Sequence, residues 1–281
     1  MHVEGNTLEY DSLSAALADL PSDDNVITLL KNIDLGAQVS VPANSGAATI
    51  TSAEGEESVV ITWENATASY FNVPTGAELT VSGNIIIRGS ENNGQRAFDV
   101  AGTLNFGEAS SASQYPMVEQ FDLTNDKDHA AAIYVKDGTL NLYSGTLSQN
   151  KGYYGGAVSV QKDGNANLFG GTISRNTAPS GGGLYVANST VTLSGTEISG
   201  NSAKQGGGIY NQHGNVTIEQ GEISGNWVDG EKVEENPNGG GIYNDNTGTV
   251  TMTGGKINGN AVKVNVDAYG RGRGAAVYNS G

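Results

Sequence analysis

Two short motifs repeat with a nearly constant period along the C-terminal half of the chain. The first is a run of small residues followed by an aliphatic residue, and its copies end at Ile133, Val158, Leu184, Ile209, Ile242 and Val277. The second is an aliphatic residue, two further residues and an asparagine, and its copies end at Asn150, Asn176, Asn201, Asn226 and Asn260. Successive asparagines lie 26, 25, 25 and 34 residues apart. Two motifs that keep the same period predict a solenoid of stacked repeats.

Each repeat also contains a third apolar segment between the two motifs, such as Val191 to Leu193. Apolar and polar residues alternate within these segments, as they do in half-buried β-strands. Each repeat therefore offers three short strands, with Gly or Asn near every corner, and the segments after Asn176 and Asn201 are expected to be turns. Because parallel crossovers are right-handed, we expect an all-β fold: a single right-handed parallel β-helix of about nine or ten coils.

The repeated asparagines are expected to have a structural role. An amide side chain both donates and accepts hydrogen bonds, so identical amides one coil apart can form a ladder along the axis. The main ladder should contain Asn150, Asn176, Asn201, Asn226 and Asn260, and a shorter one Asn211, Asn244 and Asn279.

The chain, 1–281, is expected to form one domain in three parts. Residues 1–25 form an N-terminal cap around a short helix, with Asp11 as the N-cap. The apolar face of this helix consists of Leu13, Ala16, Leu17 and Leu20. Residues 26–129 form irregular coils, and residues 130–281 form the regular repeats. The last repeat stops within a coil, so we expect the chain to be part of a longer protein whose signal peptide and anchor lie elsewhere.

The net charge of −16 is unevenly distributed along the chain. Residues 1–130 contain 19 acidic and 4 basic residues, which gives −15, whereas residues 131–281 contain 11 and 10, which gives −1. Such a surface disfavours nucleic acid and anionic membranes as partners. The chain has no cysteine and no apolar run of membrane-spanning length, so we expect neither a disulfide framework nor direct membrane insertion. A monomer is expected.

The paired GGA[I/L/V] and FxxN motifs resemble the repeats of chlamydial polymorphic outer-membrane proteins, with Ile or Leu in place of most of the Phe residues. More broadly, the repeats are similar to the right-handed β-helix, pectin-lyase-like repeats of bacterial surface adhesins. The resemblance covers 130–281 well and 1–129 loosely. It implies a non-enzymatic adhesin on the bacterial cell surface that binds a glycan or protein of a host or neighbouring cell. A polysaccharide lyase or hydrolase of the same fold, and a purely structural stalk, remain alternatives.

No catalytic residue is predicted. The NTD, DD and GHG strings of polygalacturonases and the carboxylate cluster of pectate lyases have no counterpart here, and His213-Gly214 lacks the first Gly of GHG. Glu197 and Glu222 should stack one coil apart, but that spacing is typical of a solvated face. Paired carboxylates that cleave glycans must converge across a site.

The predicted binding site lies at the corner after the asparagine column. Two insertions, 227–238 and 261–273, leave this corner in adjacent coils and should lie side by side. Together with the KGYY segment they supply Tyr153, Tyr154, Trp227, Tyr269, Arg271 and Arg273, which are residue types enriched in binding hot spots. Alternatively, Trp227 packs against its own loop, and the arginines pair with Glu231, Glu234 and Glu235.

A column of outward tyrosines is a second candidate surface. Tyr134, Tyr185, Tyr210, Tyr243 and Tyr278 each follow the inward aliphatic residue of a coil. Such a column could stack on sugar rings or anchor a protein, with Tyr210 and Tyr243 as ligand-binding candidates, or it could simply stabilise the sheet.

One loop offers a candidate metal site. Asp122, Asp126 and Asp128 supply oxygen ligands of the kind that calcium prefers, although the Gly and terminal Glu of an EF-hand are missing. A solvated acidic loop is the alternative, and no other cofactor is expected.

Overall fold

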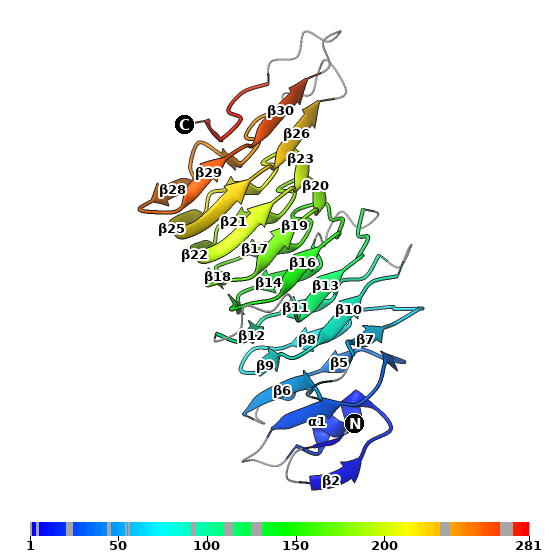
Figure 1. Cartoon of the computed structure of the whole chain (residues 1–281). Coiled ribbons are helices and arrows are strands. Elements are labelled where there is room, and N and C mark those ends of the chain that lie inside the picture. Colours follow the sequence, from blue (N-terminus) through cyan, green and yellow to red (C-terminus); the bar gives the residue numbers. More distant parts are fainter. Residues whose placement is uncertain are drawn as a thin grey trace.

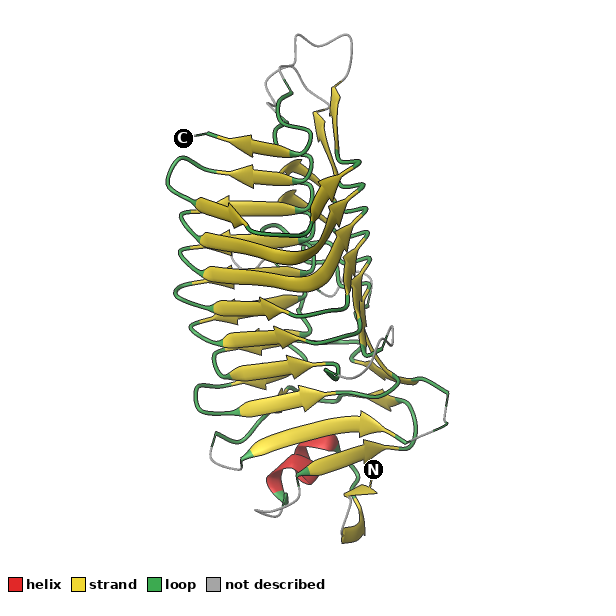
Figure 2. Ribbon diagram, turned by 60° about the vertical axis from the view of Figure 1, so that its left-hand side comes forward, coloured by secondary structure: helices red, strands yellow, loops and turns green. Residues whose placement is uncertain are grey.

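The protein is an elongated solenoid with its two termini at opposite ends (Figure 1). The computed structural model describes residues 2–3, 6–20, 25–43, 46–53, 55, 57–90, 94–109, 115–124, 131–230, 237–264 and 272–280. Successive coils stack in parallel, which confirms the predicted β-helix. As the chain rises from N to C in Figure 2, the nearer strands run to the right and the farther strands return to the left, so the coil is right-handed.

Three sheets run along the axis. Sheet 1 is bent and contains β1 (His2–Val3), β2 (Asn6–Glu9), β3 (Val26–Leu29), β4 (Ile33–Asp34), β6 (Ala47–Ser52), β7 (Val59–Thr62), β9 (Glu78–Val81), β10 (Ile85–Arg88), β12 (Thr103–Phe106), β13 (Met117–Glu119), β15 (Thr139–Leu142), β16 (Thr146–Ser148), β18 (Asn165–Leu168), β19 (Thr172–Ser174), β22 (Thr190–Ser199), β25 (Asn215–Ser224), β28 (Thr249–Met252) and β29 (Lys256–Asn258). Sheet 2 contains β5 (Val39–Ser40), β8 (Phe71–Val73), β11 (Phe98–Val100), β14 (Ile133–Lys136), β17 (Val158–Gln161), β21 (Leu184–Ala187), β24 (Ile209–Gln212), β27 (Ile242–Asn244) and β31 (Val277–Asn279). Sheet 3 contains β20 (Thr177–Ser180), β23 (Ser202–Gln205), β26 (Trp227–Gly230) and β30 (Ala261–Val264).

A regular coil passes through one strand of sheet 2 and two of sheet 1, which confirms the prediction of three strands per repeat. In β22 and β25 the two sheet 1 pieces join into one bent strand. Register keeps equivalent residues in line, since Leu184 pairs with Val158 in the preceding coil and with Ile209 in the next. The nine strands of sheet 2 agree with the expected nine or ten coils.

Sheet 3 corrects one expectation. The segments after Asn176 and Asn201, expected to be turns, form β20 and β23. Equivalent segments of adjacent coils lie in register, Thr177 beside Ser202, so each satisfies the backbone hydrogen bonds of the other. These coils therefore have a short fourth strand.

The N-terminal cap contains the predicted helix, α1 (Leu13–Ala18), whose Leu13, Ala16 and Leu17 are buried. Leu20, which was expected on the same face, lies beyond the end of the helix and packs against the core partly buried. Its N-cap is Ser12 rather than Asp11, because the Ser12 hydroxyl accepts the backbone N–H of Ala15 at 3.2 Å. An antiparallel pairing that the sequence did not reveal completes the cap. Strand β1 pairs with both β2 and β3, so the N-terminal edge of β3 is covered.

Both asparagine ladders are present. Asn176 donates from its side chain at 3.0 Å and from its backbone at 2.9 Å to Oδ1 of Asn201, and the same arrangement repeats from Asn150 to Asn260. Each side chain also donates to a carbonyl of the preceding coil, as Asn201 does to Ile173 at 2.9 Å. The shorter ladder joins Asn211, Asn244 and Asn279 at 2.6 and 3.0 Å.

Glycine is required where adjacent coils touch at the corner beside the main ladder, which runs from Asn150 to Asn260. A Cβ on Gly207 would lie 2.4 Å from the carbonyl oxygen of Gly240 and 2.5 Å from that of Trp227. Because both neighbours are backbone atoms, they cannot move aside independently of their coils. The glycine runs are therefore structural, as predicted.

Candidate binding groove and tyrosine column

A groove of about 350 Å³ follows the outer face of sheet 3. It is lined by Thr124, Gly152, Thr177, Ala178, Pro179, Ser202, Ala203, Lys204, Trp227 and Asp229. Register builds this groove, because the residue after each ladder asparagine occupies the same outward position in every coil. Thr177 pairs with Ser202, and Ser202 pairs with Trp227. Small hydroxyl residues therefore form the floor, and the indole of Trp227 rises at one end.

The floor of the groove is polar on its surface and apolar beneath. The hydroxyls of Thr177 and Ser202 are hydrogen-bonded to each other at 2.9 Å. Ala178 and Ala203, one position further along each strand, are buried. Lys204 and the exposed Asp229 add one charge of each sign to the lining.

A side chain of the following coil also contacts Trp227. The Lys263 ammonium lies 4.4 Å from the centroid of the indole ring, in cation–π contact. Lys263 belongs to the following coil and does not line the groove, whereas the other lining residues belong to the same or preceding coils. Lys263 therefore contacts the indole without lining the groove.

The two insertions lie side by side where they begin, as predicted, because β26 pairs with β30 from Trp227 beside Ala261 to Gly230 beside Val264. Arg273 is exposed, forms a β-bridge with Asn238, and does not line the groove. Tyr269 and Arg271 lie outside the described residues, as do Glu231, Glu234 and Glu235. Of the predicted shelf, the structure thus places Trp227 in a groove, whose lining does not include Tyr153, Tyr154 or Arg273.

The tyrosine column is continuous over the C-terminal coils but differs in membership from the prediction. Ser159 stands between Tyr134 and Tyr185 in the register of sheet 2, and Tyr154 packs on Tyr185 with ring centroids 4.9 Å apart. The later centroids, from Tyr185 through Tyr210 and Tyr243 to Tyr278, are 5.5, 4.7 and 5.2 Å apart. The rings of Tyr153 and Tyr154 pack edge to face, with their centroids 4.8 Å apart. Tyr134 therefore stands apart from the column.

The rings in this column stack mainly on each other. The planes of Tyr210 and Tyr243 differ by 5°, those of Tyr185 and Tyr210 by 19°, and Tyr185 is 5% exposed. Since neighbouring rings cover these faces, the column presents ring edges and hydroxyls to a ligand. Burial raises the pKa of Tyr210 to about 12 and raises the pKa values of Tyr185 and Tyr243. The hydroxyls therefore stay protonated near neutral pH, and that of Tyr185 donates to Gln212.

The candidate calcium loop is only partly described. Asp122 accepts from Thr124 Oγ1 at 2.7 Å and from Lys151 Nζ at 3.1 Å. Burial acts to raise the pKa of Asp122, but the hydrogen bonds from Thr124 and Lys151 outweigh it and lower the pKa. Asp126 and Asp128 lie outside the described residues. Within the described part of the chain, no three His, Asp or Glu side chains form a cluster that could hold a metal ion.

The predicted stacking of Glu197 and Glu222 one coil apart is confirmed by the register of sheet 1. Glu222 lies between Glu197 and Lys256 in register, and Asn258 donates to it at 3.2 Å. In the groove, Asp229 is the one carboxylate among the described lining residues.

Sequence inspection singled out Trp227 but missed Thr177, Ser202, Lys204 and Asp229. The signal for Thr177 and Ser202 was available, because counting from the ladder asparagine assigns one outward line to Lys151, Thr177, Ser202, Trp227 and Ala261. Two small hydroxyl residues followed by a tryptophan on this line predict a groove floor with one aromatic wall.

Comparison with protein-family models, curated proteins and solved structures finds no match to this chain in any of the three. In the part of the chain that the structure describes, no helix has the length and apolar character needed to cross a membrane. Function is therefore inferred from the surface itself.

Proposed function

We propose that the chain is a non-enzymatic binding module of an extracellular bacterial surface protein, and that it binds a glycan of a host or neighbouring cell. The observation that carries this proposal is the groove on sheet 3. It is open, it extends across several coils, and Trp227 forms one wall. An extended chain fits such a surface better than a compact ligand does.

The chemistry of the groove favours a saccharide. The indole of Trp227 and the ring of Pro179 suit the C–H faces of sugars, since both are rigid and apolar. Hydroxyls of Thr177 and Ser202 can donate to and accept from sugar hydroxyls. Sites for small polar ligands commonly combine apolar walls with a few placed polar groups in this way.

The residues that line the groove support a binding module better than they support a hydrolase. Hydrolysis by paired carboxylates needs two acids about 5–10 Å apart on either side of the scissile bond. Asp229 is the one acid in the described lining of the groove. Binding without turnover is therefore the function that these residues support best.

Tryptophan fluorescence offers a direct test, because the chain has two tryptophans and Trp63 is 7% exposed. A glycan array would first identify ligands, and each would then be titrated against the emission of Trp227. We expect saturable quenching or a spectral shift in the wild type. By isothermal titration calorimetry, Trp227→Ala should weaken binding at least about tenfold, or about 1.4 kcal/mol. Phe169→Ala is the control, since Phe169 is an exposed aromatic directly after β18 and does not line the groove.

Wild-type affinity in a folded Trp227→Ala variant would place the ligand elsewhere. Release of shorter sugars during incubation would favour the lyase or hydrolase. Binding to proteins alone would contradict the glycan ligand, and no binding of any kind would favour the structural stalk.

A further inference from the structure

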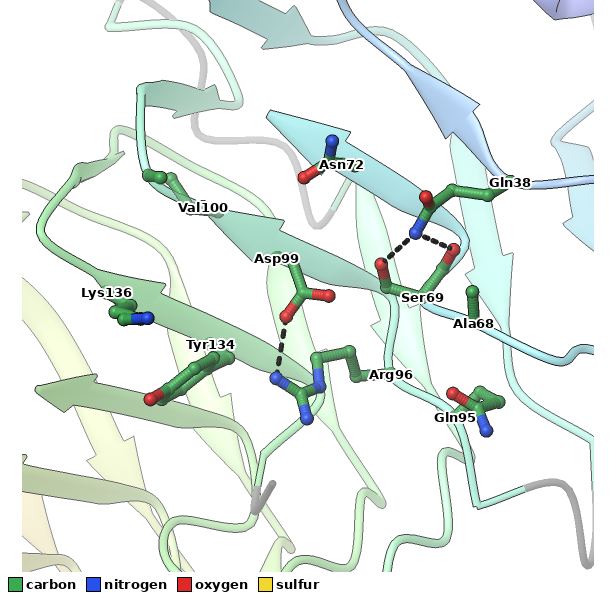
Figure 3. A pocket seen from close by; sticks show the side chains of 11 residues that line it. Gln38, Ala68, Ser69, Asn72, Gln95, Arg96, Asp99, Val100, Tyr134 and Lys136 are labelled. Atoms are coloured by element: carbon green, nitrogen blue, oxygen red, sulfur yellow. Dashed lines mark hydrogen bonds and ion pairs between the residues drawn. The ribbon is translucent and has the colours of Figure 1, made fainter. Parts of the chain in front are cut away.

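A second hollow lies on a different face, on the outer side of sheet 2 in the N-terminal half (Figure 3). Its volume is about 400 Å³, within the range of about 300–1,000 Å³ that is typical of small-molecule sites. Its lining residues come from the four successive coils of β5, β8, β11 and β14, which pair in register. It shares no lining residue with the groove on sheet 3.

Several side chains around this pocket are already held in place. Gln38 Nε2 donates to the hydroxyl of Ser69 at 2.7 Å and to its carbonyl at 3.2 Å. Arg96, which is 6% exposed, forms an ion pair with Asp99 at 2.6 Å and lies 4.8 Å from the ring centroid of Tyr134. Figure 3 shows the Gln38 contact on one side of the pocket and the Arg96–Asp99–Tyr134 group on the other. Little ordering of these side chains would remain to oppose binding.

The pocket also keeps hydrogen-bonding capacity. Asp99 uses one carboxylate oxygen for Arg96, which leaves its second oxygen as an acceptor. The side chains of Gln95 and Lys136 have no hydrogen-bond partner among the described residues. Gln38 and Asn72 donate to serines and keep their amide oxygens as acceptors. Both donors and acceptors therefore line one small hollow.

The charges around the pocket cancel. Arg96 and Lys136 line it together with Asp99, and Asp137 lies close enough to act electrostatically on Tyr134. Residues 1–130 carry a net charge of −15, so the surrounding surface repels polyanions. A neutral ligand that is rich in hydroxyl groups matches both properties, because each hydroxyl donates and accepts at once.

We propose that this pocket is a second binding site, which takes a neutral saccharide of one or two sugar units. The site goes beyond the proposed function of the groove and rests on different residues. If both sites are occupied, one chain holds two glycans on two faces of the solenoid.

The test uses the whole chain, labelled for NMR, and three neutral probes: lactose, mannobiose and N,N′-diacetylchitobiose. We expect at least one probe to produce saturable shifts in the side-chain amide signals of Gln38, Asn72 and Gln95. The double variant Gln95→Ala/Lys136→Ala should weaken this binding at least about tenfold, which corresponds to about 1.4 kcal/mol. It should stay folded, since neither side chain has a hydrogen-bond partner among the described residues.

The matched control is Gln161→Ala/Lys162→Ala, because Gln161 lies beside Lys136 in the next coil and outside the pocket. This control should bind the probe as the wild type does, and so should Trp227→Ala. The proposal is overturned if none of the three probes produces saturable shifts, or if the double variant binds as the wild type does. Binding of N-acetylneuraminic acid in preference to every neutral probe would also overturn it. The groove on sheet 3 is tested by different signals, so either proposal can fail alone.

Discussion

The two halves of the solenoid place their aromatic residues on opposite sides of the coil. In the N-terminal coils aromatic rings fill the interior: Phe71 stacks on Phe98 at 5.0 Å, and Tyr70 contacts Phe121 edge-on at 5.0 Å. In the C-terminal coils the interior is aliphatic and contains the asparagine ladder, whereas the tyrosines form a column outside. The same parallel β-helix is thus stabilised by two different kinds of packing.

The difference explains why one half is regular in sequence and the other is not. A ladder amide needs an identical amide one coil away, in register, to pair its donors and acceptors. A buried ring needs only enough apolar volume around it, and neighbours of different shape can supply that volume. The ladder therefore imposes a period on residues 131–280, whereas the aromatic interior leaves residues 26–124 free to vary in spacing.

Removal of an interior ring should have the largest effect. Phe98 is fully buried between Phe71 and Phe106, so Phe98→Ala leaves a cavity and should lower the free energy of unfolding by about 3–5 kcal/mol. Urea denaturation would measure this loss of unfolding free energy. The control is Phe169→Ala. Because Phe169 is 46% exposed, its removal should lower the free energy of unfolding far less. Equal losses in the two variants would contradict the contrast between the halves.

Interruption of the main asparagine ladder should have the second largest effect on stability. Asn201→Ala leaves the backbone N–H of Asn176 and the carbonyl of Ile173 without their partner, and each buried unsatisfied group costs about 1–3 kcal/mol. We expect a loss of about 2–4 kcal/mol in the same denaturation experiment. Asn167→Ala is the control, because Asn167 pairs with Asn141 on the outer, partly solvated face. If the ladder asparagines only filled space, Asn201→Ala and Asn167→Ala would show the same small loss of unfolding free energy.

The outer tyrosine column should make stability fall at alkaline pH. Burial raises the folded-state pKa of Tyr210 from 10.0 to about 12, so its protonated form is favoured in the folded chain. This contribution is complete below pH 10, the unfolded value, and is lost as the pH rises through about 12. Urea midpoints should therefore fall over that window, and less steeply in Tyr210→Phe. Tyrosinate absorbance that shows every tyrosine titrating at its ordinary pKa would disprove the effect.

The smallest effect is expected at Lys263, whose ammonium lies over the indole of Trp227. This contact is exposed, unlike that of the buried Arg96 over Tyr134. Lys263→Gln should lower stability by less than about 1 kcal/mol and should change the emission of Trp227. A loss above about 2 kcal/mol would mean that Lys263 has a structural role that the cation–π contact does not explain.

Much of the solenoid could be predicted because its causes are local. Alternation of apolar and polar residues indicated the strands, and the spacing of identical asparagines indicated the ladders that hydrogen bonds such as Asn176 to Asn201 now confirm. The position of Trp227 beside the ladder was also accessible. The groove floor was overlooked because Thr177 and Ser202 are unremarkable alone and become a surface only when register aligns them.

The sequence by itself determined that this chain coils, with what period and with which residues in the ladder, because those properties depend on patterns within a repeat and between adjacent repeats. Only the tertiary structure decided that Tyr154 packs beside Tyr185 where Ser159 interrupts the column, and that Gln38 and Lys136 line one pocket. The physical reason is that such contacts depend on the lengths and paths of the intervening corners. Among the described residues of the N-terminal half, no ladder of buried asparagines reveals those paths.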